Sequence, residues 1–579
     1  MFASTCGDKS ALLACLLAVA SCAKVAPAPH DARSEAARLG EGEHVLGVAC
    51  NPEQPPPPWP ARRLTTQEYA RTVSDLFSSC KACDGLAKEV AIDLGELPRD
   101  GEANASFSNM DSRTSQRHVD TFIKVAESVA RAATSRDERL QELAGSCALK
   151  TPLDRGCFQS FAQKMGLRVW RRPLEAAQLA RLSELAQVER PTESYRFLLT
   201  ELLAAPEFVL HLESGANAGD SSPFALASRL SYHFWQTSPD ERLLQAAASG
   251  ALDTEAGYRA EVERLLKSQR AHATWFRFFR EWLQLDEFGG FSLDRAFENF
   301  SGGLKATVQL YDDAVWEVEQ LVGYYTFDTN GSYPELLTSD LVVTRSPKLA
   351  ALYGVEPWDG RSFPRRFPQG QRSGLFTRAA VLISGSHATN PFHRGAFVRR
   401  RLLCEPIEPP VQRPPEAFVL PVFDPSASTR TRYEHKVASG GCKGCHELFS
   451  PYGYALEAYD ALGRYRTMER LVDDAGDAHG RVPIDSAVTV SLTPERTLSA
   501  DGPVELSRAL ASSHEASACF ARQYFRFTFR RTETPADACT LDSILSSLKT
   551  GGLLAAYRDV AFSPAFRRAP SQASAGERP

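Results

Sequence analysis

The stretch Gly441-Cys442-Lys443-Gly444-Cys445-His446 is the most specific local pattern in the chain, and the fold around it must accommodate its chemistry. Two cysteines separated by two residues and followed at once by histidine form the attachment signal for a c-type haem. Two thiols at this spacing reach the two vinyl groups of one porphyrin edge, and the next residue presents an imidazole to the iron. We therefore predict covalent haem c at Cys442 and Cys445, with His446 as an iron ligand. A local disulfide, or half of a metal site that happens to precede a histidine, is the alternative.

The second axial ligand of such a haem is not fixed by the motif. A haem that transfers electrons normally has two protein ligands, whereas a catalytic haem often keeps one position open. Met468 follows the motif closely and is our candidate for the sixth ligand, with a surface or packing role as the alternative. His435, His479 and His514 remain open as other ligands. His387 and His393, in a loop of small and polar residues before the motif, are further candidate functional residues, unless they are hydrogen-bonded structural histidines.

The N-terminus reads as an export signal. Lys9 precedes a short apolar run, residues 11–20, which is too short to span a bilayer and ends in small residues. Val19-Ala20-Ser21-Cys22 resembles the bacterial lipoprotein box, which predicts a signal peptide over residues 1–21 and a lipidated Cys22. Ala23 after this cysteine favours the outer over the inner membrane. An ordinary cleaved signal with a chance cysteine is the alternative.

Cysteine usage is typical of an oxidising compartment. Of 13 cysteines, eight remain after those assigned to the signal, the lipid and the haem, and an even remainder suits disulfides. We predict the pairs Cys147–Cys157 and Cys519–Cys539, because each closes a short local loop. A second C-x-x-C, residues 80–83, is followed by aspartate instead of histidine, and a structural disulfide role is preferred there to a redox dithiol.

Composition and periodicity indicate a mainly α protein. The chain has 579 residues, which implies three or more domain-sized units, and its net charge of −5 gives no indication of nucleic acid as a partner. The proline-rich residues 22–60 are expected to form a spacer. Apolar residues recur at helical spacing over 116–133, and an aromatic stripe over 271–285 is expected to lie in the core. No helix–strand alternation of the βαβ kind is apparent.

Several stretches together resemble a family of exported bacterial cytochrome-like proteins built from domains of unknown function 1587, 1595, 1592, 1588 and 1585 in series. The carrying stretches include Arg62–Phe77, Ala225–Gly250 and Cys442–Arg466. The resemblance implies several helical modules in series, with a cytochrome c-like haem-binding segment near residues 430–470. The expected ranges are 61–135 (1587-like), 145–215 (1595-like), 220–365 (1592-like), 370–470 (1588-like) and 480–570 (1585-like).

The haem motif of this family falls on Cys442, Cys445 and His446. The residues after it usually include Asp-Pro and Phe in the family, where this chain has Ser450-Pro451 and Tyr454. The departure touches the loop beside the haem and none of the attachment groups. Other positions of the motif are kept, namely Glu457, Asp460, Gly463 and Arg466.

Three functional hypotheses follow. The first is a lipid-anchored, monohaem c-type cytochrome of the outer membrane, periplasm or cell surface that passes electrons to an unidentified envelope redox partner. Many relatives carry an additional cytochrome domain that is not found here, so one haem is expected. The second is a haem-dependent redox enzyme, peroxidase- or oxygenase-like, because electron transfer alone needs only about 100 residues. The third is a non-redox surface scaffold or binding protein.

Overall fold

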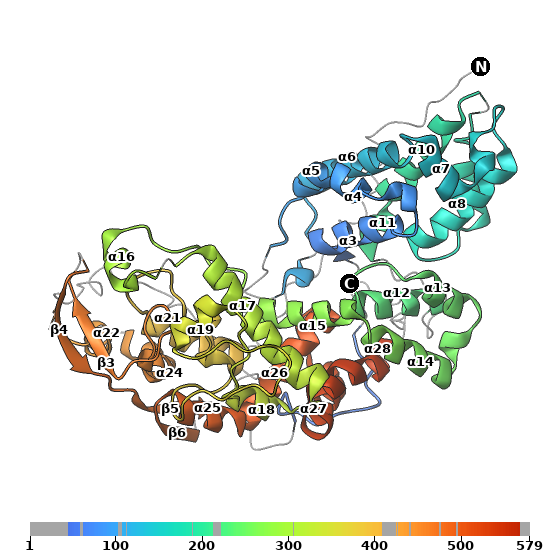
Figure 1. Cartoon of the computed structure of the whole chain (residues 1–579). Coiled ribbons are helices and arrows are strands. Elements are labelled where there is room, and N and C mark those ends of the chain that lie inside the picture. Colours follow the sequence, from blue (N-terminus) through green and yellow to red (C-terminus); the bar gives the residue numbers. More distant parts are fainter. Residues whose placement is uncertain are drawn as a thin grey trace.

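The computed structural model describes residues 44–567, except for 58, 60–61, 102–106, 112, 188, 212–221, 305, 408–423, 425, 439–441, 474–475 and 494–495. It is mainly helical, as the sequence predicted, with a few short strands (Figure 1). The predicted signal peptide and lipidation site at Cys22 lie outside the described residues. Buried apolar side chains form two cores, and we name the two parts of the molecule after them, the N-terminal lobe and the main lobe.

The N-terminal lobe spans residues 62–211 and contains one of the two cores. Its longest helix, α6, covers Gln116–Ala133 as predicted, and Thr65 caps α3 through a capping box with Glu68. Two short strands close the lobe, with Arg62 opposite His211 in an antiparallel pair. The elements are β1 (Arg62–Arg63), α3 (Thr66–Leu76), α4 (Leu86–Glu89), α5 (Ala91–Gly95), α6, α7 (Asp137–Ala144), α8 (Arg155–Trp170), α9 (Ala176–Ser183), α10 (Pro191–Ala204), α11 (Pro206–Val209) and β2 (Leu210–His211).

The main lobe begins at α12 and carries the larger core. The predicted aromatic stripe lies on α15, where Trp275, Phe279 and Trp282 are buried at its centre. The helices are α12 (Pro223–Phe234), α13 (Glu241–Ala248), α14 (Glu255–Leu266), α15 (Gln269–Trp282), α16 (Arg295–Ser301), α17 (Val308–Gly323), α18 (Tyr333–Thr338), α19 (Pro347–Tyr353), α20 (Ala379–Leu382), α21 (Pro391–Phe397), α22 (Thr429–Lys436), α23 (Cys442–Glu447), α24 (Ser450–Ala455), α25 (Pro503–Ala511), α26 (His514–Phe529), α27 (Ala538–Asp559) and α28 (Pro564–Arg567).

Two antiparallel hairpins interrupt the helices between α24 and α25. Strands β3 (Met468–Val472) and β4 (Ala478–Pro483) form the first, and β5 (Ala487–Thr493) and β6 (Arg496–Asp501) form the second. They lie at the edge of the main lobe that is farther from the N-terminal lobe (Figure 1). The sequence analysis did not anticipate them. In β5 the buried Val488, Val490 and Leu492 alternate with more exposed residues, which is the period of a half-buried strand.

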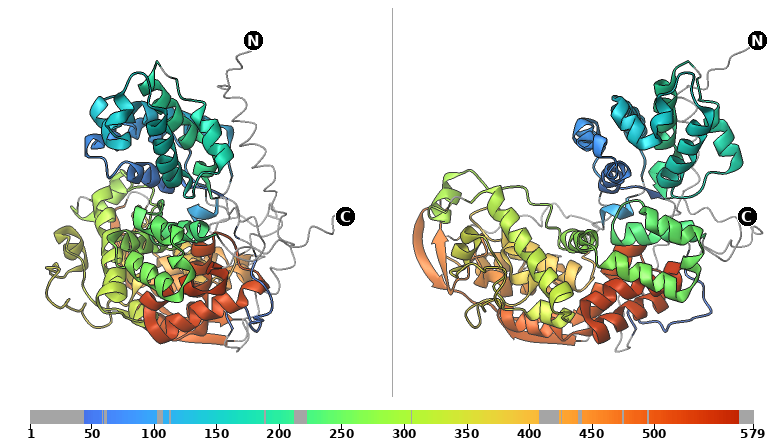
Figure 2. Two further views of the ribbon diagram at one scale, coloured as in Figure 1. Left: turned by 90° about the vertical axis from the view of Figure 1, so that its right-hand side faces the viewer. Right: turned by 45° about the vertical axis from the view of Figure 1, so that its right-hand side comes forward.

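The short 3-10 helix η3 (Ser108–Met110), which precedes α6 in the chain, contacts the main lobe; the two lobes are visible in Figure 2. The backbone N–H and the hydroxyl of Ser108 donate to the Glu281 carboxylate of α15, at 2.9 and 2.8 Å. The side-chain amide of Asn109 donates to the carbonyl oxygen of Phe527 on α26, at 2.8 Å. Residues from the N-terminal part of the chain are therefore hydrogen-bonded to helices of the main lobe.

Of the predicted spacer, residues 22–60, the structure describes residues 44–57 and 59. His44 contacts Asp542 at 2.7 Å, Val45 is fully buried, and Cys50 forms a disulfide with Cys539 of α27. This end of the predicted spacer is therefore attached to the C-terminal part of the main lobe.

The disulfides confirm one predicted pair and correct the other. Cys147 and Cys157 are bonded, as are Cys80 and Cys83. The pair Cys519–Cys539 is wrong, because Cys519 bonds Cys404 and Cys539 bonds Cys50. Cys519 lies inside α26 against the π-helix η8 (Val398–Leu402), which Cys404 follows closely, so its partner is a neighbour in space and not in sequence.

Removing the Cys50–Cys539 disulfide is expected to destabilise the main lobe. The bond joins residues 489 apart, so its loss frees a large amount of chain entropy in the unfolded state. We expect the double variant Cys50→Ser, Cys539→Ser to lose roughly 2–5 kcal/mol of unfolding free energy in urea. The matched control is Cys80→Ser, Cys83→Ser, which opens a loop with a separation of only 3 residues. Equal losses in both variants would contradict the expectation.

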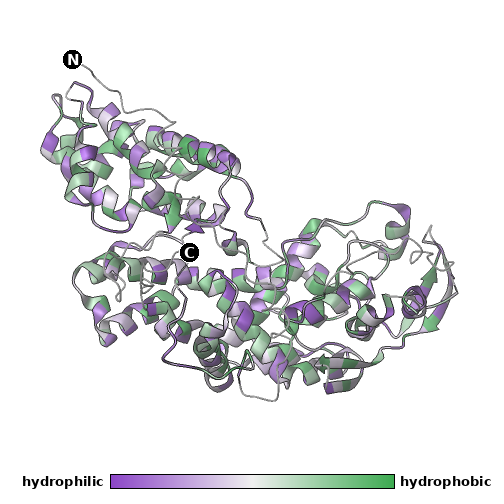
Figure 3. Cartoon of the chain, turned by 180° about the vertical axis from the view of Figure 1, so that it is seen from behind, coloured by the Kyte–Doolittle hydropathy of each residue, from purple (hydrophilic) through white to green (hydrophobic). Residues whose placement is uncertain are grey.

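Most helices carry both hydrophobic and hydrophilic residues along their length. Figure 3 shows green and purple residues alternating along most of them, as expected for helices that pack one face inward. Among the described residues, no helix combines the length and the apolar character needed to cross a membrane.

Candidate functional site

The C-x-x-C-H motif forms a short helix, α23, in the main lobe. Cys442 and Cys445 are three residues apart, which places them as neighbours on one side of an α-helix. Both are half-exposed and neither is in a disulfide. The helix contains one internal ion pair, between Lys443 and Glu447 at 3.7 Å. The two thiols are therefore neighbours on the helix, partly exposed to solvent and free of any disulfide.

A second C-x-x-C sequence in the same chain can be compared with the one in α23. The other C-x-x-C, at residues 80–83, lies in a 3-10 turn, and its two sulfur atoms are bonded to each other. All eight described cysteines outside the motif are paired in four disulfides. Cys442 and Cys445 are therefore the exceptions among the described cysteines, at the one C-x-x-C that is followed by histidine.

His446 is held by contacts on one side of its imidazole. Its Nδ1 lies 3.1 Å from the hydroxyl oxygen of Ser450, and its ring lies 4.0 Å from that of Phe392 and 4.7 Å from that of Phe449, between centroids. Burial lowers the pKa of His446 below its ordinary value, so the imidazole is neutral at neutral pH. A neutral imidazole with Nδ1 engaged leaves Nε2 as the nitrogen for a metal ion.

Helices α21 and α24 are in unusually close contact beside His446. A Cβ atom on Gly453 would lie 1.8 Å from the carbonyl oxygen of Pro391, and one on Gly395 would lie 2.1 Å from that of Phe449. Two glycines, one on each helix, therefore allow the two backbones to touch. This contact places Phe392 of α21 against His446.

Arg394, on α21 directly after His393, was not predicted as a functional residue from the sequence. Its side chain is 4% exposed and forms an ion pair with Glu457 at 3.3 Å. It also donates to four backbone carbonyl oxygens at 2.7–3.0 Å, those of Leu382, Leu456, Tyr459 and Asp460. The available signal was a charged residue in a short motif, Asn390-Pro-Phe-His-Arg-Gly395, that has polar and small residues around it.

The motif positions kept from the resembled family are structural. Glu457 also accepts from Thr389 at 2.7 Å and from Arg466 at 3.0 Å. Asp460 accepts from the backbone N–H of Leu462 and Arg464, and Gly463 has a φ of +78° in the same turn. The turn after α24 is thus fixed by buried polar contacts.

The other candidate residues are not gathered at α23. His393 is exposed, and His387 is half-buried in its loop with no hydrogen-bond partner for Nδ1. Met468 is 43% exposed at the start of β3. His435 and His479 are exposed as well, and His514 begins α26. The assignment of Met468 as a sixth ligand stays a prediction.

The residues present fit a covalently attached haem. Two open thiols and a neutral imidazole with a fixed Nδ1 partner are the groups that the attachment requires. Apolar side chains border them, namely Phe392, Phe449 and Leu448, of which Leu448 is 43% exposed. Within the described residues, no group of three or more His, Cys, Asp or Glu side chains is arranged to hold a metal ion directly.

Four family models match the chain in order. The families described as proteins of unknown function DUF1587, DUF1592, DUF1588 and DUF1585 match residues 62–135, 222–355, 372–469 and 498–566. These are cytochrome-like domain families, and the DUF1588 range includes α21, α23 and α24. The predicted 1595-like module is not among the matches. No curated protein and no solved structure matches the chain.

Proposed function

Because the chain belongs to the family of cytochrome-like proteins in which domains 1587, 1592, 1588 and 1585 follow one another, we propose that it is a monohaem c-type cytochrome of the bacterial cell envelope. It would carry electrons through one haem, bound covalently to Cys442 and Cys445 and ligated by His446. An envelope redox partner, not yet identified, would accept or supply the electron.

The observation that carries this proposal is the state of helix α23. Its two thiols stay open in a chain that pairs its other described cysteines, and the adjacent imidazole is neutral with only Nδ1 hydrogen-bonded. A structural disulfide would need Cys442 and Cys445 to be bonded to each other, as Cys80 and Cys83 are. The contrast favours haem attachment over that alternative.

Each residue of the site has a defined task in this proposal. The thiols of Cys442 and Cys445 anchor the macrocycle, and Ser450 orients the imidazole of His446 through Nδ1. Phe392 and Phe449 exclude water from the imidazole. The haem, when bound, supplies the one-electron chemistry of its iron.

The proposal is tested by haem retention. The full chain, expressed with a c-haem maturation system, should give a band with peroxidase-type haem stain after denaturing electrophoresis and a c-type reduced-minus-oxidised spectrum. Cys445→Ala should lose the covalent stain. The control Cys80→Ala, Cys83→Ala alters the other C-x-x-C and should keep it. An unstained wild-type chain that is folded and matured would refute the proposal.

Ser450 is expected to adjust the reduction potential of that haem. Ser450→Ala removes the hydrogen bond to His446 Nδ1 and should raise the potential, because the imidazole becomes a weaker electron donor. Ser450→Asp introduces a carboxylate at this position and should lower it. A shift on the order of 40 mV is expected, since a hydrogen bond contributes about 1 kcal/mol and 59 mV corresponds to about 1.4 kcal/mol for one electron. Spectroelectrochemical titration measures the shift, and changes in the same direction for both variants would contradict it.

The proposal includes a location. Residues 19–22 resemble the bacterial lipoprotein box, and Ala23 after them favours the outer membrane. The mature protein would therefore be attached by lipid at Cys22, with the folded lobes on the aqueous side. Membrane fractionation of the wild type and Cys22→Ala tests this, and an unchanged membrane fraction in the variant would contradict a lipid anchor.

A further inference from the structure

A small pocket lies where the N-terminal lobe meets the main lobe, away from α23. It is lined by Trp59, Arg62, His211, Arg229, Tyr232, His233, Thr528 and Arg530. Arg62 and His211 face each other across the β1–β2 pair, and Arg530 follows the last residue of α26. The pocket thus combines residues of both lobes with Trp59 of the N-terminal segment. Its cavity volume is only about 20 Å³.

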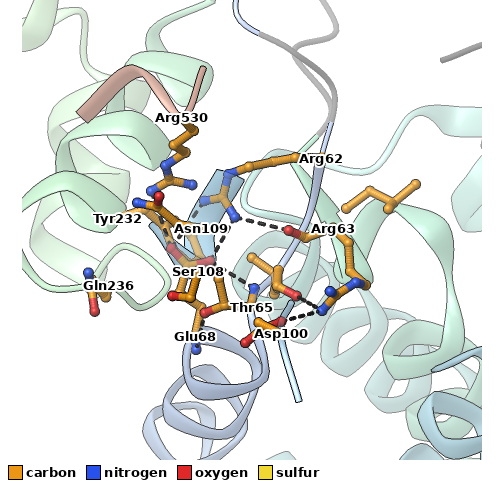
Figure 4. A network of polar contacts seen from close by, with 12 residues as sticks. Arg62, Arg63, Thr65, Glu68, Asp100, Ser108, Asn109, Tyr232, Gln236 and Arg530 are labelled. Atoms are coloured by element: carbon orange, nitrogen blue, oxygen red, sulfur yellow. Dashed lines mark hydrogen bonds and ion pairs between the residues drawn. The ribbon is translucent and has the colours of Figure 1, made fainter. Parts of the chain in front are cut away.

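In the part of the pocket wall that the structure describes, positive charge exceeds negative charge around Glu68. Glu68 is fully buried, and it receives Arg62 at 2.7 Å and Arg530 at 3.2 Å, so two guanidinium groups share one carboxylate. Figure 4 shows both guanidinium groups converging above Glu68, next to Tyr232. A third cation, Arg171, lies 5.8 Å from the ring centre of Tyr232. Burying charge without a counter-charge is unfavourable, so this wall is suited to an anion.

Arg171 adds to the excess because its hydrogen-bond partners among the described residues are neutral. Its guanidinium donates to the backbone carbonyl oxygens of Glu207, Phe208 and Leu210 at 2.6–3.2 Å. Among the residues that the structure describes, no carboxylate forms an ion pair with it. Burial, together with Arg62 and Arg171, holds the pKa of His211 well below its ordinary value, which is the response expected in a positive field.

Three buried polar atoms of the pocket residues have no hydrogen-bond partner. They are Nε of Arg530, whose side chain is 8% exposed, Nε2 of His211 and Oγ1 of Thr528. A buried donor without an acceptor costs roughly 1–3 kcal/mol, so native proteins rarely leave one in place. An unused guanidinium N–H beside excess positive charge needs an acceptor that carries negative charge.

We propose that this pocket binds one compact anion, an inorganic oxyanion or the carboxylate group of a small molecule. Arg530 would hold it through Nε, with His211 donating from Nε2 and Arg62 adding charge. Trp59 forms the remaining wall, where its ring packs on Phe529 at 5.1 Å between centroids and its Nε1 donates to the carbonyl oxygen of Ala565. The narrow space suits a few heavy atoms and excludes a nucleotide.

Titration of the full-length protein tests the proposal. Inorganic phosphate and, separately, acetate are added in a buffer of constant ionic strength, with binding followed by calorimetry and by tryptophan fluorescence, since Trp59 lines the pocket. Saturable binding of one anion per chain is expected. Phosphate alone would identify an inorganic oxyanion, and acetate alone or the tighter binding of acetate would identify a carboxylate. Saturation by neither would overturn the proposal.

Substitutions of pocket residues test whether the anion binds at this site. Arg530→Gln removes Nε and the charge but leaves Arg62 on Glu68, and His211→Phe keeps a ring against Tyr232 while removing Nε2. Each should weaken anion binding at least tenfold. Arg558→Gln, which alters an arginine paired with Asp559 elsewhere on the surface, is the matched control and should bind as the wild type does. If Arg530→Gln fails to fold, His211→Phe decides, and undiminished binding in the folded variant would refute the assignment.

Discussion

Arg394→Met is expected to destabilise the main lobe by roughly 3–5 kcal/mol, the range found when one partner of a buried ion pair is removed. The methionine would remove one donor from each of four carbonyl oxygens, of which those of Leu456 and Asp460 keep a backbone N–H donor. It would also leave Glu457, which is 2% exposed, with Arg466 as its remaining cation. Burial already raises the pKa of Glu457 in spite of Arg394 and Arg466. Losing one of these cations makes the charged carboxylate still less favourable.

Urea unfolding followed by circular dichroism measures this loss. Arg366→Met is the matched control, because Arg366 is 65% exposed and its ion pair with Asp340 lies at the surface, where such pairs contribute about 0–1 kcal/mol. Haem incorporation should fall together with stability in the Arg394 variant, since Arg394 fixes the turn that follows α24. A loss below about 1 kcal/mol, equal to that of the control, would show that Arg394 does not organise this part of the lobe.

Local sequence signals predicted the helices well. The apolar repeat over residues 116–133 matches α6 at both ends. The aromatic stripe of α15 lies in the core, with Trp275 fully buried. In each case the information is carried by residues within a few turns of one another, so no knowledge of the tertiary fold is required.

Contacts between residues far apart in the sequence could not be predicted from such local signals. Cys519 was paired with Cys539 because they are close in sequence, yet the fold brings each beside a cysteine from another segment. The attachment of the described end of the predicted spacer could not be foreseen for the same reason, because Cys50 bonds Cys539 of α27, a residue 489 positions away. The β5–β6 hairpin had a signal in the alternation of Val488, Val490 and Leu492, which a search for helical periods passes over.

At the candidate site, too, local features could be predicted from the sequence, whereas contacts between distant residues could not. Cys442, Cys445 and His446 could be identified from spacing alone, because their chemistry is local. Ser450 was noted only as a departure from the family pattern, whereas the structure makes it the Nδ1 partner of His446. The closeness of Gly395 and Gly453 depends on the packing of two helices, and isolated glycines in a sequence do not reveal which backbone approaches them.

Gly453→Ala is expected to separate α21 from α24 and to disturb the surroundings of His446. The added Cβ would lie 1.8 Å from the carbonyl oxygen of Pro391 and 3.0 Å from the backbone nitrogen of Gly395, so it meets backbone atoms and not a flexible side chain. The helices must move apart by more than an ångström, which also withdraws Phe392 from His446. We expect a loss of about 3 kcal/mol, the upper end for overpacking a close contact.

Unfolding in urea and the haem spectrum of the matured protein measure the two consequences. Gly95→Ala on α5 is the matched control, because a Cβ there meets nothing within 4 Å and alanine favours the helix. The control should be neutral or slightly stabilising, and its spectrum should be unchanged. In Gly453→Ala the stability and the yield of haem should both fall, because α24 carries Ser450 and α21 carries Phe392. A stable Gly453→Ala protein with a normal spectrum would mean that the two helices tolerate a wider spacing and that their contact does not position His446.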